Sequence, residues 1–450
     1  MLENLRQPPE TTINHRHPLF STRSICRASE GSQGKTLAAP LWVLSCAPAV
    51  NESPKTETAE QTNASAAPRL PAPIPTLVSN EIGLVALLAR IDAHPGAELA
   101  LDTEADSFHH YFEKVCLLQL AVAGEAFLID PLAVPAPEGE ASPLAPLTAR
   151  LAERPLLLHG ADYDLRLLLR GYGFRAGLLF DTMIAAQLLG ETEIGLAALL
   201  TKRLGIVLDK KFQRADWSER PLSPEMSAYA AADVLYLGEL ADSLRKDLEA
   251  KGRLDWVAEE CGRLVAAPFS ARESDPETDW RLKGTNALTG RERAFVRALW
   301  EAREERASEL DRPPFRILTN ERLLDGARAA ARGELDLAKL FPGPRTLPTT
   351  FARRVTQALE QARALLPAEW PEPRRGERVE ADPALEREIE KLKKKRDIKA
   401  KELALDPSVL ASRAALAAVA RAFLKNRGPM PAARVVEETG ISGWRAEQLA

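Results

Sequence analysis

The order of apolar segments between residues 77 and 252 constrains the fold more than any other feature of the sequence. Short apolar runs typical of strands occur at 98–102, 115–123, 126–129, 156–159 and 178–180. Longer stretches with helical spacing of apolar residues occur at 79–92, 144–152, 163–171, 182–189, 195–204 and 223–251. The first strands lie close together, and the later ones alternate with helices. This order predicts a mixed sheet flanked by helices, an α/β domain over residues 77–252.

The segment before this domain has a different composition. Residues 1–76 are rich in Pro, Ser, Thr, Asn and Ala, show no sustained period, and end in the Pro-rich run 66–75. Such a composition buries too little apolar surface to offset the chain entropy that folding removes. We therefore expect a disordered N-terminal extension over residues 1–76.

The segment after the domain is almost wholly helical in pattern and contains a repeat. Arg303–Leu310 aligns with Arg396–Leu403, and each copy is followed by a proline, a short apolar pair and an amphipathic helix. The repeat predicts two small helical modules, at 285–366 and 384–450, joined by a Pro- and charge-rich linker at 367–383. The second copy stops abruptly, so we expect its last helix to be short or missing.

Charge, cysteines and hydropathy exclude several classes of protein. The chain carries 60 basic and 64 acidic residues, which gives a net charge of −4. Any site that binds a polyanion such as a nucleic acid must therefore be a local cluster of basic residues. No apolar stretch approaches the roughly 18 residues that span a bilayer, so we expect no membrane partner and a cytoplasmic location. The four cysteines are too far apart for a disulfide framework or a structural zinc site: Cys26, Cys46, Cys116 and Cys261.

Acidic residues recur where the predicted strands end and on a late helix. Asp102 and Glu104 are two apart at the end of a strand, where both side chains share one face. Asp164 follows the strand at 156–159, and Tyr229 and Asp233 are four apart on a helix. Each motif alone is more typical of a solvated strand end, a helix cap or a core tyrosine than of a catalytic site. Converging carboxylates would repel one another unless cations neutralised them, and oxygen ligands favour Mg²⁺ or Mn²⁺.

Together these motifs resemble the tyrosine subclass of the DEDD 3′-to-5′ exonuclease superfamily, and specifically the ribonuclease D family. The residues that carry the resemblance are Asp102-Thr-Glu104, His159 to Leu165, and Tyr229 to Asp233. Residues 208–222, called the connecting segment below, are also similar to the family's segment between its second and third motifs. The two helical repeats resemble HRDC domains, which RecQ-type helicases and ribonuclease D share. The resemblance runs from about residue 77 to 365 and continues to the end of the chain.

The resemblance implies a fold and an activity. The fold is a ribonuclease H-like α/β exonuclease domain followed by two all-α HRDC-like domains. The activity is metal-dependent 3′–5′ exoribonuclease cleavage, which releases nucleoside 5′-monophosphates from RNA 3′ ends, with tRNA precursors as the implied substrates. We expect the chain to act as a monomer.

The resemblance also implies roles for individual residues. Two divalent ions, Mg²⁺ or Mn²⁺, serve the two ends of an in-line displacement at phosphorus. Asp102 bridges both ions, Glu104 and Asp233 complete the protein ligands of the first, and Asp164 holds the second largely through water. Tyr229 orients the attacking water together with Glu104, since a phenol with a reference pKa of about 10 is a hydrogen-bonding partner more readily than a base.

The connecting segment contains candidates for RNA binding. Lys210, Lys211 and Arg214 are interleaved with Phe212 and Trp217, which predicts phosphate contacts and base stacking along a single strand. An exposed loop around a buried Trp217 is the alternative interpretation.

Two other functions remain open on the residues alone. A DNA exonuclease of the proofreading or repair type would use the same four carboxylates, although the chain has no polymerase- or helicase-sized region. A catalytically inactive nucleic-acid scaffold is opposed by the presence of an appropriate residue at all five chemical positions. The residues do not choose between Mg²⁺ and Mn²⁺, or identify one physiological RNA.

Overall fold

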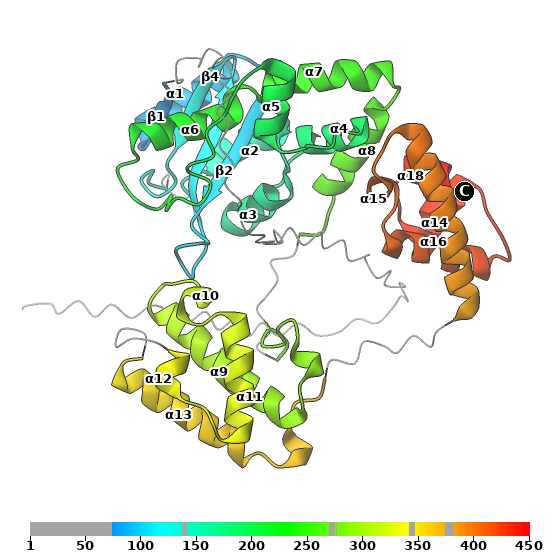
Figure 1. The fold of residues 1–450 in the computed structure, drawn as a ribbon. Helices are drawn as coiled ribbons and strands as arrows, with labels where there is room; N and C mark the ends of the chain where they lie inside the picture. Colours follow the sequence, from blue (N-terminus) through cyan, green and yellow to red (C-terminus); the bar gives the residue numbers. More distant parts are fainter. Residues whose placement is uncertain (1–73, 137–141, 270–274, 276, 342–346, 374–381) are drawn as a thin grey trace, which may run out of the picture. The chain divides into compact units, whose positions relative to one another are not determined.

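The computed structural model describes residues 74–136, 142–269, 275, 277–341, 347–373 and 382–450 (Figure 1). The extension expected at 1–76 lies outside the described residues, apart from its last three. The middle of the linker expected at 367–383 also lies outside them.

The strands of the described residues form one six-stranded sheet with the spatial order β1-β4-β3-β2-β5-β6. β3 pairs antiparallel with β2 and with β4, whereas the β1–β4, β2–β5 and β5–β6 pairs are parallel. The predicted mixed sheet is therefore confirmed. The strands are β1 (Thr76–Val78), β2 (Leu99–Ala105), β3 (Val115–Val122), β4 (Glu125–Ile129), β5 (Pro155–Leu158) and β6 (Leu178–Asp181).

Helices cover both faces of the sheet, as Figure 1 shows. One face is covered by α1 (Glu81–Asp92), α2 (Ala145–Glu153) and α3 (Asp162–Tyr172). The other is covered by α4 (Thr182–Leu189), α5 (Leu196–Leu204), α6 (Pro224–Leu235) and α7 (Leu237–Ala250), while α8 (Leu254–Val265) packs against β6. Helices α1 to α5 confirm the helical patterns read from the sequence.

Side-chain alternation along β2 separates an apolar face from the face that carries the candidate acids. Leu99 and Leu101 belong to the core shared with α1, α2 and α3. Ala100 belongs to the opposite core, shared with α4 to α7. Because residues two apart in a strand share a face, Asp102 and Glu104 lie on the side of Ala100. Helix α6 packs on this side, against β2, β3 and β4.

Two strands differ from the prediction by more than one residue. β1 begins at Thr76, inside the expected extension, and was not predicted because its stability comes from parallel pairing with β4 rather than from a local pattern. β2 extends to Ala105 because it stays paired with β3 beyond Asp102. Asp102 and Glu104 therefore lie within a strand rather than at its end.

The single helix predicted at 223–251 is also wrong, because it breaks at Tyr236. Ser223 caps α6 by accepting a hydrogen bond from the Met226 backbone nitrogen at 3.1 Å, with proline at the first helical position. Tyr236 has φ −100° and ψ 1°, outside the helical range, and α7 starts after it. The break lets α6 cover the sheet while α7 packs against α4 and α5.

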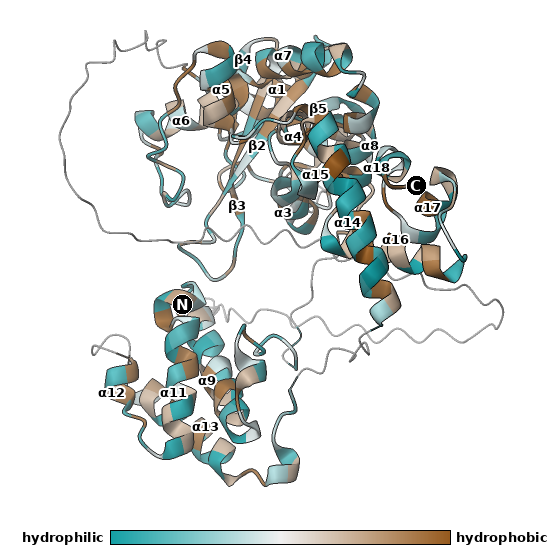
Figure 2. Ribbon diagram, turned by 45° about the vertical axis from the view of Figure 1, so that its right-hand side comes forward, coloured by the Kyte–Doolittle hydropathy of each residue, from teal (hydrophilic) through white to brown (hydrophobic). Residues whose placement is uncertain are grey.

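The remainder of the described chain is helical and has two separate apolar cores. The first core contains residues of α9 (Gly290–Glu309), α11 (Asn320–Arg332), α12 (Leu337–Leu340) and α13 (Thr349–Ala364), with α10 (Pro314–Ile317) packed on α9. The second belongs to α14 (Pro383–Leu403), α16 (Arg413–Lys425), α17 (Ala432–Thr439) and α18 (Gly443–Leu449), with α15 (Pro407–Leu410) packed on α14. Figure 2 shows the alternation of hydrophobic and hydrophilic residues along α14.

The helices of the described residues are all too short or too polar to cross a lipid bilayer.

Candidate active site

Three carboxylates from two elements gather at the centre of the sheet. Asp102 and Glu104 come from β2, and Asp233 comes from α6, which packs over β2. One ligand atom from each of these residues lies within 4.8 Å of the other two. The strand period and the helix packing thus bring together the first and third sequence motifs.

Asp164 approaches the same place from α3. It sits in the first turn of that helix and is only 6% exposed. One of its carboxylate oxygens accepts a hydrogen bond from the Thr103 hydroxyl at 2.5 Å. Thr103 lies between Asp102 and Glu104 in the chain, so this bond ties the second motif to the first. Asp164 is not one of the three residues whose ligand atoms lie within 4.8 Å of one another.

The pKa values of these carboxyl groups are all raised. Burial, followed by repulsion from Asp164, Asp233 and Glu104, holds the pKa of Asp102 well above its ordinary value. Burial and the neighbouring acids raise the pKa of Glu104 to about 9. Burial is the largest cause that raises the pKa of Asp164 and of Asp233 to about 7. Ionising the whole group therefore needs compensating positive charge, and an oxygen-only ligand set fits a hard divalent cation.

The carboxylates open into a cavity of about 350 Å³. This volume lies in the range of small-molecule sites. The cavity is lined by Asp102, Thr103, Glu104, His159, Leu196, Gln213, Tyr229, Asp233 and Leu237.

Tyr229 lies one helical turn before Asp233 and faces the same cavity. Its ring packs edge-on to Phe212 at a centroid distance of 5.9 Å and near Trp217 at 6.0 Å. Burial, then the charges of Asp233 and Glu104, raise the pKa of the phenol. The hydroxyl therefore keeps its proton at neutral pH and can orient a polar ligand by hydrogen bonding.

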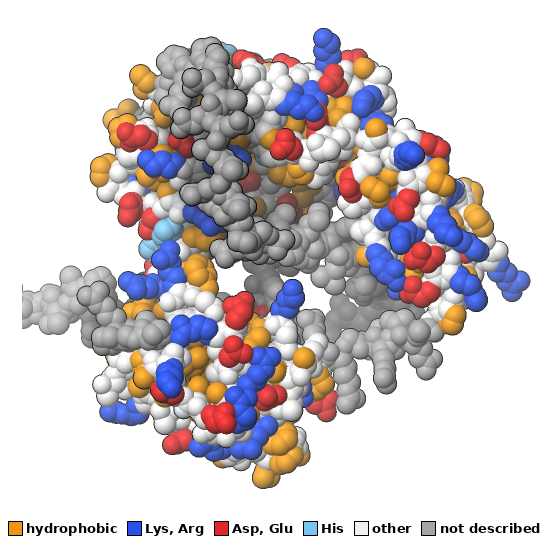
Figure 3. All heavy atoms as spheres, viewed as in Figure 1, with side chains coloured by type: hydrophobic (Ala, Val, Ile, Leu, Met, Phe, Trp, Pro, Cys, Tyr) orange, Lys and Arg blue, Asp and Glu red, His pale blue; other side chains and the backbone are white. Residues whose placement is uncertain are grey.

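The predicted RNA-binding residues of the connecting segment differ in their exposure to solvent. Lys210, Lys211 and Arg214 are exposed, and Lys211 lies 5.2 Å from the centre of the Phe212 ring. Trp217 is 1% exposed, so the prediction that it stacks on bases is wrong. Its ring packs in a small core that includes residues of β3, β4 and α6, which leaves no face for a base. Figure 3 shows basic and acidic side chains interspersed over the visible surface, as the small net charge suggests.

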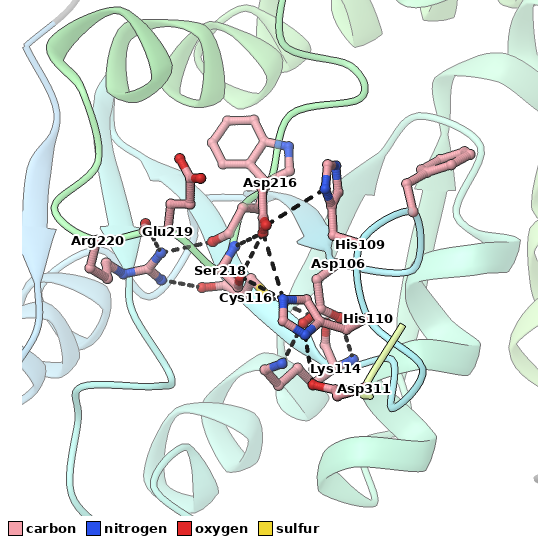
Figure 4. Close-up of polar contacts among 12 residues, drawn as sticks. Asp106, His109, His110, Lys114, Cys116, Asp216, Ser218, Glu219, Arg220 and Asp311 are labelled. Carbon is pink, nitrogen blue, oxygen red and sulfur yellow. Dashed lines mark hydrogen bonds and ion pairs between the residues drawn. The ribbon is translucent and has the colours of Figure 1, made fainter. Parts of the chain in front are cut away.

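Polar contacts hold the connecting segment against β3 and the loop after β2 (Figure 4). The carboxylate of Asp216 lies 3.6 Å from Nδ1 of His109. Arg220 donates a hydrogen bond to the Cys116 backbone oxygen at 2.7 Å. These contacts join residues about 100 positions apart and fix the segment that supplies Gln213 to the cavity.

The sequence analysis assigned no role to five residues that line the cavity: Thr103, His159, Leu196, Gln213 and Leu237. For His159 a signal was present, because it directly follows a parallel strand. Side chains at the carboxyl ends of parallel strands gather at one edge of a sheet. Leu196, Gln213 and Leu237 reach the cavity through tertiary packing that no local pattern reveals.

Comparisons with known proteins agree with this site. Residues 75–249 match a family model described as 3′-5′ exonuclease, and residues 292–359 match the HRDC domain model. Ribonuclease D of Acidiphilium cryptum is 32% identical over 320 residues, which cover 69% of this chain and 78% of that protein. Ribonuclease D of Zymomonas mobilis is 35% identical over 306 residues, which cover 66% and 75% respectively.

Solved structures extend the comparison to the fold. The crystal structure of Escherichia coli RNase D, described as an exoribonuclease involved in structured RNA processing, aligns with a TM-score of 0.61 and 26% identity. The alignment covers 84% of this chain and 96% of that one. The matches confirm the ribonuclease H-like exonuclease fold and an HRDC domain, and the acidic cluster indicates divalent-metal use. The chain belongs to the ribonuclease D family and is a 3′–5′ exoribonuclease.

Proposed function

We propose that this exoribonuclease uses two divalent ions, Mg²⁺ or Mn²⁺, to trim the 3′ ends of tRNA precursors. The observation that carries the proposal is the convergence of half-buried carboxylates with raised pKa values on one cavity of about 350 Å³. Their proposed role is metal binding, and the set is Asp102, Glu104, Asp164 and Asp233.

The roles proposed for the four acids are those that the family resemblance implies, and their placement supports them. Asp102 would be a ligand of both ions, in keeping with a pKa raised by all three other acids. Glu104 and Asp233 would hold the first ion with it, since their ligand atoms cluster with that of Asp102. Asp164 would hold the second ion, largely through water, from its separate position beside Thr103.

The proposed reaction is hydrolysis of the last phosphodiester bond. The ions would lower the pKa of the attacking water and stabilise negative charge on the leaving oxygen. Tyr229 and Glu104 orient the water by hydrogen bonds so that its oxygen attacks phosphorus opposite the 3′ oxygen. As the water oxygen bonds to phosphorus and gives up a proton, the bond from phosphorus to the 3′ oxygen of the preceding nucleotide breaks. That oxygen takes a proton, and a nucleoside 5′-monophosphate is released.

Digestion of end-labelled RNA tests this function. With Mg²⁺ or Mn²⁺, a 3′ label should appear at once in a 5′-mononucleotide, whereas a 5′-labelled strand should shorten stepwise. EDTA should stop both reactions, and a DNA strand of the same sequence should be cleaved more slowly. Early release of the 5′ label, or cleavage in excess EDTA, would contradict the proposal.

Replacing Tyr229 with Phe is expected to lower kcat by about 10- to 100-fold, the range for losing a partner that orients a metal-site ligand. The Phe ring retains the packing against Phe212 and Trp217, so KM and thermal stability should change little. Steady-state kinetics on a short oligoribonucleotide measure both constants. An unchanged kcat would remove Tyr229 from the proposed chemistry.

The connecting segment supplies a second prediction. Alanine at both Lys210 and Lys211 should weaken RNA binding. The slope of the logarithm of the binding constant against the logarithm of the salt concentration should become shallower by about 0.7 for each lost phosphate contact. Trp217→Phe should leave this slope unchanged and instead lower the free energy of unfolding by about 1 kcal/mol. Binding titrations at several salt concentrations and urea unfolding distinguish the two effects. An altered slope for the Trp217 variant would contradict the assignment.

The substrate, the domains and the assembly complete the proposal. We assign the exonuclease domain to residues 77–252, the HRDC domain to 285–366, and a second HRDC-like domain to 384–450. The assignment of the second HRDC-like domain is supported by α14 and α15, which repeat the pattern of α9 and α10.

Structured RNA precursors are favoured as substrates by the description of the Escherichia coli relative. We further propose that the chain is a cytoplasmic monomer. Trimming of a tRNA precursor in vitro would test the substrate, and sedimentation would test the monomer.

A further inference from the structure

His159 lines the cavity but has no part in the proposed chemistry. It directly follows β5, and the backbone after it is held by the carboxylate of Asp181. Asp181 accepts hydrogen bonds from the backbone nitrogens of Gly160 at 3.0 Å and Ala161 at 2.8 Å. The imidazole ring is therefore carried by a well-anchored strand end.

Hydrogen bonding on the far side of the ring indicates which nitrogen carries the proton. The Thr182 hydroxyl donates to the Leu158 backbone oxygen at 3.1 Å. A hydroxyl has only one proton, so its contact with Nδ1 of His159, at 2.9 Å, is one in which the ring donates. Burial lowers the pKa of the imidazole, which favours the neutral ring. In a neutral ring protonated at Nδ1, Nε2 is a hydrogen-bond acceptor.

This acceptor is buried and lacks a partner. Nε2 of His159 is a buried atom with no hydrogen bond to the described residues. The Ile194 backbone also approaches the ring and acts as a hydrogen-bond acceptor toward its protonated form. Buried polar atoms normally have partners, so an unpaired acceptor on a residue that lines a ligand cavity points to a donor on the ligand.

The substrate class narrows the identity of that donor. If the scissile phosphate lies at the carboxylates, as proposed above, the 3′-terminal nucleotide occupies the cavity beside His159. An enzyme that removes nucleotides in succession meets all four bases, whose donor groups differ in kind and position. The hydroxyls of the terminal ribose are donors shared by all four nucleotides.

We propose that Nε2 of His159 accepts a hydrogen bond from a ribose hydroxyl of the 3′-terminal nucleotide. His159 is then a substrate-binding residue that recognises the sugar. This inference rests on the proposed position of the scissile phosphate.

The test couples a change in the protein to a change in the substrate. The substrates are one oligoribonucleotide sequence with a ribose, a 2′-deoxyribose or a 3′-deoxyribose at the last position. For the wild type, one of the two deoxy ends should lower kcat/KM for removal of the last nucleotide by about 2- to 12-fold. The deoxy end that shows the loss identifies the donating hydroxyl. His159→Phe should cleave the ribose end and that deoxy end at equal rates.

A matched pair of amide variants guards against effects of misfolding. In His159→Asn the amide is long enough to reach Thr182 but too short to reach the position of Nε2, so the preference should disappear. In His159→Gln the amide can reach that position, so part of the preference should return. Thermal midpoints with and without Mg²⁺ check that each variant folds and binds metal.

Three results would overturn the proposal. The first is a wild type that cleaves all three ends equally. The second is a preference that persists in both His159→Phe and His159→Asn. The third is a folded, metal-binding His159→Phe variant that cleaves no end, since His159 would then act in the chemistry. If the proposed function itself were wrong, the result would be different, because the wild type would then cleave RNA in the presence of EDTA.

Discussion

Replacing Asp102 with Asn is expected to slow RNA cleavage by about 10³- to 10⁴-fold in saturating Mg²⁺. Asp102 lies among the other three acids, and its pKa is raised by each of them. Asn keeps the shape of the side chain but removes the negative charge shared between the two proposed ions. Metal ions contribute several kcal/mol of transition-state stabilisation, and each 1.36 kcal/mol is a factor of ten in rate. Single-turnover cleavage of a 5′-labelled oligoribonucleotide measures the loss.

Asp162→Asn provides a matched control on a neighbouring element. Asp162 is also an acid in the first turn of α3, but it is half exposed and pairs with Arg166 on the same helix. This variant should cleave RNA at the wild-type rate, since exposed ion pairs contribute little to stability. The Asp102 variant should be at least as stable as the wild type without metal, because one source of repulsion has been removed. Cleavage within tenfold of the wild-type rate would refute the assignment of Asp102.

Much of the site was predictable because each motif has a local period. Two residues along a strand share a face, so Asp102 and Glu104 could be paired without knowledge of the fold. Four residues along a helix share a face, which pairs Tyr229 with Asp233 in the same way. What joins the motifs is tertiary packing of α6 and α3 on the sheet. That convergence was inferred from family resemblance rather than from periodicity.

The errors occurred where distant contacts decide the structure. β1 has only three residues, and its partner β4 lies about 50 positions later, so no local pattern marks it. Burial of Trp217 depends on Leu117, Leu128 and Ala230, which come from other elements. The orientation of His159 depends on Thr182 in α4. An exposed aromatic residue and a buried one look alike in sequence when the elements that cover them lie elsewhere in the chain.

Mg²⁺ is expected to raise the thermal midpoint of the exonuclease domain more at pH 8.5 than at pH 6. In the metal-free fold the pKa values of Asp164 and Asp233 are about 7 and that of Glu104 is about 9, above the ordinary values for Asp and Glu. Between about pH 4 and pH 9 the folded protein therefore holds protons that the unfolded chain has released. The free energy of unfolding must then fall as pH rises through this window.

A divalent cation reverses this trend because it binds the ionised carboxylates in place of protons. At 100 times its dissociation constant, an ion adds about 2.7 kcal/mol of stability, which corresponds to roughly 5–11 °C for a domain of this size. Near pH 6 protons compete for the same oxygens, so the shift should be smaller. Scanning calorimetry in EDTA and in Mg²⁺ or Mn²⁺, at constant ionic strength, measures it.

The Asp102→Asn variant separates specific binding from general screening. It keeps nearly the whole surface charge but lacks the central ligand, so its midpoint should respond weakly to Mg²⁺ at both pH values. Screening of surface charges by salt would instead shift the variant and the wild type equally. A wild-type shift that is the same at pH 6 and pH 8.5, or larger at pH 6, would show that protons and cations do not compete for these carboxylates. The raised pKa values and the proposed metal site are thus two consequences of one arrangement, in which acidic groups lie too close together to ionise without a cation.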